Sequence, residues 1–138
     1  MAMAKKRISV HAQVGRLRHF FPNSTLKIIG YDKGFIWEGS LKPCDLSNTY
    51  DIRIEYNAGF HPNVYVISPN PLPLAKYATE LPHIRDHEKQ NLCLYHRDMN
   101  EWNECMMIAN TIIPWTSEWL LYYEIWAATG IWHGGGIH

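Results

Sequence analysis

Cys93 is the residue in this 138-residue sequence whose surroundings best suit covalent chemistry. It follows a long irregular segment, and five basic or imidazole side chains lie within ten residues of it: His83, Arg85, His87, Lys89 and His96. Positively charged neighbours favour the thiolate, which is the nucleophilic form of cysteine. We therefore predict that Cys93 is a nucleophile whose thiolate these neighbours stabilise. The competing interpretation is a space-filling thiol, because free cysteines are among the most often buried residues.

A second interpretation of the same segment is a metal site. Four nitrogen and sulfur ligands lie within 14 residues, and zinc accepts such a set in tetrahedral geometry: His83, His87, Cys93 and His96. Their spacing is not that of a standard zinc finger, and the paired C-x-x-C motif is absent. A small zinc-binding module therefore stays open as an alternative function.

The other two cysteines, Cys44 and Cys105, have no histidine near them in the sequence, and we predict that they are structural. An odd count of three cysteines argues against a disulfide framework and indicates the reducing cytoplasm. No Ser/His/Asp arrangement, Gly-rich phosphate loop or paired-carboxylate motif is present, so no cofactor is expected.

Charged residues are divided unevenly along the chain, although the 13 basic and 13 acidic residues cancel. The first 97 residues have a net charge of about +5, and the last 41 have about −5 together with five of the six tryptophans. A total charge of zero argues against a nucleic-acid coat. No apolar run reaches the roughly 18 residues of a membrane helix, and the N-terminus lacks the apolar core of a signal peptide. We expect neither nucleic acid nor membrane as a partner.

The elements that must position Cys93 follow from hydrophobic periodicity. Residues 7–20 carry apolar side chains at helical spacing, and Pro22 ends that helix. Four β-rich runs follow, and Asp32-Lys33-Gly34 between the first two is a hairpin signal because Asp and Gly tolerate a positive φ. The predicted strands are residues 25–31, 35–41, 50–56 and 63–68.

Residues 69–92 contain four prolines, so we predict a long irregular segment that leads to the cysteine. A short helix around residues 103–112 is expected to bury Cys105. A last helix, capped by Thr116 or Ser117, should run to about Thr129 and stop at Gly130. We interpret residues 1–138 as one α+β domain with flexible tails at 1–6 and 134–138.

This pattern resembles the ubiquitin-conjugating enzyme family. The element order is the same, and residues 59–66 (GFHPNVYV) are similar to the proline-rich sequence that precedes a central strand in that family. His83 precedes Cys93 by the offset of the histidine in the family's H-P-N motif, and residues 92–94 (LCL) resemble its I-C-L around the thioester cysteine. Trp102 falls within one residue of the family's tryptophan spacing.

Two departures affect the implied mechanism. Ile84 and Arg85 replace the Pro and Asn of the H-P-N motif, and Gln90 replaces a common Gly. The missing Asn supports the active-site loop and the oxyanion in the family. Arg85 could stabilise the oxyanion by its charge, or His83, His87 or Asn91 could do so. Trp102 is interpreted as a core anchor or as a wall of the site. An inactive conjugating-fold module that only binds a partner is the alternative that these departures leave open.

The C-terminal segment, residues 111–138, resembles the bacterial branch found in anti-phage signalling operons (CBASS), beside a cGAS-like nucleotidyltransferase. The resemblance implies that Cys93 forms a thioester with the C-terminal glycine of the nucleotidyltransferase and passes the acyl group to a lysine of an acceptor protein. His83 and His87 would move the protons. Arg7, Arg16 and Arg18 lie on or just before the helix that docks the activating enzyme in the family. The need for such an enzyme here stays open.

Overall fold

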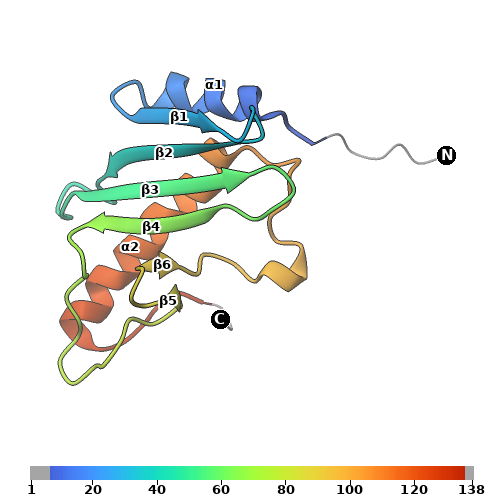
Figure 1. The fold of residues 1–138 in the computed structure, drawn as a ribbon. Helices are drawn as coiled ribbons and strands as arrows, with labels where there is room; N and C mark the ends of the chain where they lie inside the picture. The colour runs from blue at the N-terminus through green and yellow to red at the C-terminus, as the bar shows by residue number, and fades with distance from the viewer. Residues whose placement is uncertain (1–6, 136–138) are drawn as a thin grey trace.

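The computed structural model describes residues 7–135 and shows an α+β protein built on one antiparallel sheet. Helix α1 (Val10–Phe20) lies at one edge of the sheet, and helix α2 (Ile112–Thr129) runs across its back (Figure 1). The strand order is β1-β2-β3-β4-β6-β5. The strands are β1 (Thr25–Ile29), β2 (Gly34–Leu41), β3 (Tyr50–Asn57), β4 (Asn63–Ser68), β5 (Ile84–Asp86) and β6 (Asn91–Leu92).

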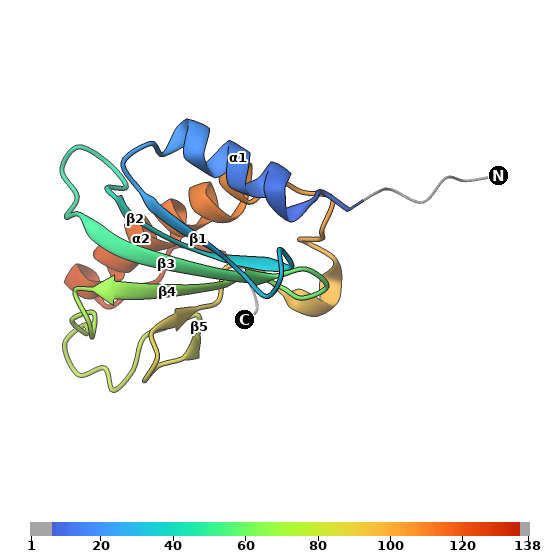
Figure 2. The same ribbon diagram turned by 45° about the horizontal axis from the view of Figure 1, so that its top comes forward.

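The predicted four-strand meander is confirmed by β1 to β4. Strand β3 shows why periodicity found it: Tyr50, Ile52, Ile54 and Tyr56 point into the core, and the residues between them are more exposed. Figure 2 shows the twisted sheet with α2 behind it, and the buried residues of β3 and α2 belong to one core cluster. The core therefore lies between the sheet and α2.

Two local details of the first half differ from prediction. Helix α1 begins at Val10, because the hydroxyl of Ser9 accepts the amide N–H of Ala12 and caps the helix there. The β1–β2 turn takes its positive φ values at Gly30, Tyr31 and Asp32. Gly34 instead begins β2, where a Cβ atom would overlap the carbonyl oxygen of Tyr56 on the neighbouring strand. Glycine is needed at this position because β2 and β3 lie close together there, and not because the turn requires a positive φ.

The expectation that residues 69–92 hold no regular element is wrong at the end of that segment. β5 and β6 add two short strands to the sheet, with Ile84 opposite Leu92 and Asn91 opposite Tyr65. Gln90 immediately precedes β6 with a φ of 55°, the region that favours the glycine common in the resembled family. Its fully buried side chain accepts the N–H of Leu72 and donates to the carbonyl of His87. The side-chain amide of Gln90 therefore holds the proline-rich segment beside β6, the strand that precedes Cys93.

The C-terminal helices also differ from prediction. Only a 3₁₀ turn, η2 (Ile108–Asn110), forms where a helix over 103–112 was expected. The buried amide of Gln13 bonds the carbonyl of Met106 and the N–H of Ile108, which an α-helix would use internally. α2 begins at Ile112 rather than after Pro114, because a proline in the first turn removes only an N–H that has no intrahelical partner. Its predicted end at Gly130, with a φ of 79°, is confirmed.

Residues 7–135 contain no helix long and apolar enough to cross a bilayer.

Candidate active site

Cys93 is the first residue after β6, where the short β5–β6 hairpin meets the back of the molecule. Its N–H donates to the carbonyl of His83 (3.1 Å), which fixes the position of the cysteine relative to β5. The same carbonyl accepts the indole N–H of Trp119 from α2 (3.1 Å). The carbonyl oxygen of His83 therefore links Cys93 to α2.

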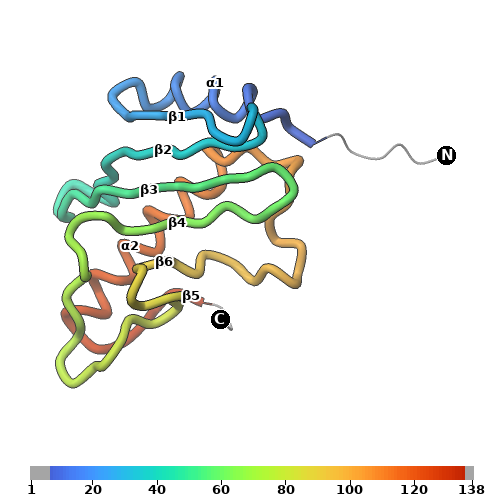
Figure 3. The backbone as a smooth tube through the Cα atoms, in the orientation of Figure 1, coloured from blue at the N-terminus to red at the C-terminus, as the bar shows by residue number. Residues whose placement is uncertain are grey.

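The half-buried Cys93 opens into a cavity of about 280 Å³. After α2 the chain turns back toward β5 (Figure 3). The returning segment stacks the ring of Trp132 on His83, with centroids 4.7 Å apart. Other lining residues from the loop, α2 and the returning segment include Tyr95, Glu101, Trp115, Glu118, Tyr122, Gly134 and Gly135. The last two glycines were assigned to a flexible tail, and here they lie at the cavity.

Burial is the largest influence on the Cys93 thiol, and it raises the pKa. The positive charges of Arg85 and Arg97 lower this pKa but do not outweigh burial. Arg85 therefore stabilises the thiolate, as predicted, but the net shift of the Cys93 pKa is upward because burial outweighs this charge. The charged residues near Cys93 can be read from the sequence, but the loss of water around its thiol depends on the folded structure. Burial therefore works against ionisation of the Cys93 thiol.

Arg85 supports the loop from outside the cavity. Its guanidinium Nη2 donates to the carbonyl oxygen of Tyr95 (3.1 Å). The thiol of Cys93 is directed at the same oxygen, with Sγ at 3.6 Å. Arg85 can therefore act on the thiol by its charge, but it does not line the cavity.

The other predicted site residues have structural contacts. The ring of His87 accepts the N–H of Leu81 through Nδ1 (3.2 Å) and so orders the loop before β5. The side-chain amide of Asn91 donates to Asn63 on β4 (3.3 Å). Trp102 is buried and donates to Thr111 (3.1 Å), as a core anchor does. None of His87, Asn91 and Trp102 lines the cavity, so His83 is the predicted residue that shares it with Cys93.

Several lining residues were not predicted from the sequence. Trp115, Trp119 and Tyr122 are spaced i, i+4 and i+7, which places them on one face of α2. The concentration of tryptophans in the last 41 residues was visible in the sequence, and this helical spacing was the signal for a shared wall. Trp132 and Glu101 had no local signal, because only the return of the chain brings them to Cys93.

The structure does not support the alternative zinc site at His83, His87, Cys93 and His96. Within residues 7–135, no three His, Cys, Asp or Glu side chains are grouped closely enough to hold a metal ion. His87 is instead bonded to the loop backbone, as described above. The four candidate ligands that are near in sequence are therefore not brought together in space.

The basic residues assigned to partner docking are exposed around α1. Arg7 forms an ion pair with Glu104 (3.6 Å). The guanidinium of Arg16 lies over the ring of Phe20 (5.6 Å), and Arg18 is exposed in the last turn of the helix. Lys5 and Lys6, which precede Arg7 in the sequence, lie outside the described residues.

A comparison with protein families matches residues 13–138 to the family described as Type II CBASS E2 protein. The chain belongs to this family. The matched range includes β6, Cys93 and the whole of α2. No curated protein matches the sequence. The E2 in the family name implies a relationship with ubiquitin-conjugating enzymes, and the CBASS name implies a role in that defence system.

Proposed function

We propose that this Type II CBASS E2 protein is a cysteine acyltransferase of the ubiquitin-conjugating type. The single observation that carries the proposal is the position of Cys93, whose half-buried thiol opens into a cavity that it shares with His83. The order of helix, antiparallel meander, cysteine segment and C-terminal helix agrees with that fold. The donor would be the C-terminal glycine of a cGAS-like nucleotidyltransferase, and the acceptor a lysine.

The chemistry has two acyl transfers. In the first, the Cys93 sulfur attacks an activated glycine carbonyl, the activating group leaves, and a thioester forms. In the second, an amine attacks the thioester carbonyl and the sulfur leaves. His83 lies at the cavity, and an imidazole nitrogen is suited to act as the general base that removes the thiol proton in the first step.

The loop around Cys93 supplies positioning. Arg85 holds the carbonyl of Tyr95, and Gln90 holds the preceding loop, so the cysteine is fixed from both sides. Of the candidates for the missing asparagine's role, His83 lines the cavity, whereas Arg85, His87 and Asn91 do not. We therefore assign oxyanion contact to His83 and loop support to the other three.

The exposed basic residues Arg7, Arg16 and Arg18 would receive an activating enzyme where one is required. They lie on or beside α1, at the edge of the sheet and apart from the cavity lining. A docked protein could therefore contact α1 and leave the thiol accessible. Charge reversal at Arg16 and Arg18 should slow loading of Cys93 by that enzyme without changing discharge of a preformed thioester.

The test is formation of a thiol-sensitive adduct. The purified protein is mixed with the nucleotidyltransferase of its operon, with ATP and any adenylating protein encoded there, and separated on a non-reducing denaturing gel. We expect an adduct that a reducing thiol cleaves, that Cys93→Ala abolishes, and that Cys93→Ser converts to a thiol-resistant ester. Cys44→Ser and Cys105→Ser are the matched controls. An adduct that survives Cys93→Ala and disappears in Cys44→Ala contradicts the assignment.

Two observations favour a second function, a binding module without catalysis. Burial raises the pKa of the Cys93 thiol, and Ile84 and Arg85 stand where the related enzymes have Pro and Asn. Such a module would capture the nucleotidyltransferase in a pull-down but form no covalent adduct under any of the conditions above. The two functions are separated by the same experiment.

A further inference from the structure

The ionisable lining of the cavity is acidic beside the cysteine and histidine. Two carboxylates, Glu101 and Glu118, reach it, and within residues 7–135 no lysine or arginine does. Glu101 accepts the N–H of His96 (3.1 Å), and Glu118 accepts the hydroxyl of Tyr122 (3.4 Å). Both carboxylates are exposed at the rim, so they can meet a ligand without a change in the fold.

The walls below these carboxylates are aromatic. Tyr95 and Trp115 meet edge to face, with centroids 5.8 Å apart. The ring of Trp132 lies against Trp119 (5.6 Å) and Tyr122 (5.9 Å). These contacts hold the rings in place before any ligand binds. An aromatic recess with carboxylates at its rim attracts an organic cation, because the faces of the rings are negative.

We propose that this recess, formed by Tyr95, Glu101, Trp115, Glu118, Tyr122 and Trp132, binds the acceptor amine as an alkylammonium ion. The proposal rests on the acyltransferase function and assigns the acceptor a site. A lysine side chain fits the chemistry: its methylene stem packs against the rings, and its ammonium meets the ring faces and the two carboxylates. The volume of about 280 Å³ lies at the lower end for ligand pockets, which suits one unbranched chain.

The proton balance of the second transfer follows from this placement. The ammonium gives one proton to a rim carboxylate, and the lone pair that is released forms the C–N bond to the thioester carbonyl. The C–S bond then breaks with its electron pair on the sulfur of Cys93. The second proton of the amine leaves to that sulfur, so the products are an amide and the thiol. The carboxylate passes its proton to solvent at the exposed rim.

Single-turnover discharge tests the recess. Cys44→Ser/Cys105→Ser protein is loaded as the Cys93 thioester and mixed with free lysine, which is a cation at neutral pH, or with hydroxylamine, which is mostly uncharged. We expect Glu118→Gln and Trp115→Leu each to raise the half-saturating lysine concentration about three- to thirtyfold. Discharge by hydroxylamine should change less than about twofold, because it gains nothing from the cation site. Glu88→Gln, the same charge change on an exposed loop residue outside the cavity, is the control.

Equal slowing of both nucleophiles by Glu118→Gln and Trp115→Leu would overturn the proposal, because the recess would then serve the acyl donor or the fold. A second measurement needs no thioester. Choline and its uncharged isostere 3,3-dimethylbutanol are titrated into the unloaded protein, with the tryptophan indole N–H signals followed by NMR. We expect saturable shifts with choline that Trp115→Leu weakens, and none with the isostere. Equal binding of the two probes overturns the recess, whereas absence of any thioester overturns only the acyltransferase function.

Discussion

The guanidinium of Arg85 and the thiol of Cys93 share one acceptor, the backbone carbonyl oxygen of Tyr95. Arg85 Nη2 lies 3.1 Å from this oxygen, and Cys93 Sγ lies 3.6 Å from it. The shared acceptor brings a permanent positive charge near the sulfur, and it keeps the guanidinium out of the cavity. Arg85 is therefore a positioning residue that also acts on the thiol by its charge.

Loss of this charge should make Cys93 harder to ionise. Arg85 lowers the pKa of Cys93 against the dominant effect of burial, so Arg85→Met should raise that pKa further. In Cys44→Ser/Cys105→Ser protein, we expect the pH profile of iodoacetamide alkylation to move to higher pH, with Arg85→Lys between the two. Arg53→Met, on the sheet and paired with Glu38, is the control. A profile that stays in place would show that Arg85 acts on the loop alone.

Cys44, rather than Cys93, should be the first cysteine to react with a thiol reagent. Cys44 is exposed, and a hydrogen bond with the Ser47 hydroxyl lowers its pKa, whereas burial raises the pKa of Cys93. Limiting iodoacetamide followed by peptide mass spectrometry should therefore find label on Cys44 first. Ser47→Ala should slow labelling of Cys44 and leave Cys93 unchanged. Preferential labelling of Cys93 would contradict the burial argument.

Gly134 should be needed for the closed form of the cavity. A Cβ atom at this position would lie 2.7 Å from Trp132 Nε1 and 2.7 Å from Tyr122 Cδ2, so one of these packed rings must shift. Gly134→Ala should alter the near-ultraviolet circular dichroism of the tryptophans and speed alkylation of Cys93. At Gly135 a Cβ atom meets nothing within 4 Å, so Gly135→Ala should leave the tryptophan spectrum unchanged. Identical spectra for the two variants would count against this packing.

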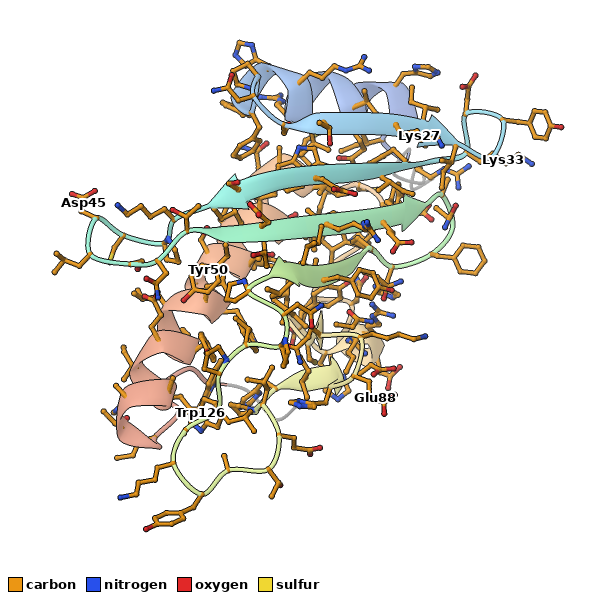
Figure 4. All side chains as sticks on the ribbon, turned by 60° about the vertical axis from the view of Figure 1, so that its left-hand side comes forward. Lys27, Lys33, Asp45, Tyr50, Glu88 and Trp126 are labelled. Atoms are coloured by element: carbon orange, nitrogen blue, oxygen red, sulfur yellow. The ribbon has the colours of Figure 1, made fainter. Side chains whose placement is uncertain are left out.

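Glu124 should contribute more to stability than its surface position on α2 suggests. Its carboxylate accepts the hydroxyls of Ser47 and Tyr50, each at 2.7 Å, and the N–H of Asn48 at 3.1 Å. Tyr50 begins β3 beside α2 (Figure 4), so this carboxylate ties the β2–β3 loop to the helix. Glu124→Ala should lower the free energy of unfolding by about 2 kcal/mol. In the same urea titration, Glu118→Ala should cost less than about 0.5 kcal/mol.

The protein should lose stability in alkali. Burial raises the pKa of Tyr95 to about 12 and that of Tyr123 to about 12, so the unfolded chain releases these protons first. Their contribution is complete below pH of about 10 and is lost as the pH rises toward about 12. Urea unfolding across this interval should show the decline, and Tyr123→Phe should reduce it. Tyr31→Phe, which removes a fully exposed phenol, is the control. An unchanged slope in Tyr123→Phe would refute this origin.

Local patterns were sufficient for much of the fold. α1, the four long strands and the end of α2 were predictable because hydrophobic period, proline and glycine act within a few residues. β5 and β6 were not predictable, since strands of three and two residues are too short to show a period. They form because β4 (residues 63–68) has an edge with which β6 can pair, and because Gln90 holds the preceding loop beside that edge.

The sequence by itself was sufficient to predict Cys93 as a nucleophile with His83 ten residues before it, and to indicate the family to which the chain belongs. It did not determine the state of the thiol or the shape of the site. Both depend on burial and on the return of Trp132 and Gly134 to Cys93. Only the tertiary structure decided that Arg85 supports the loop and that an acidic, aromatic recess lies beside the sulfur. The physical reason is that desolvation and side-chain proximity arise from long-range packing, which no local spacing specifies.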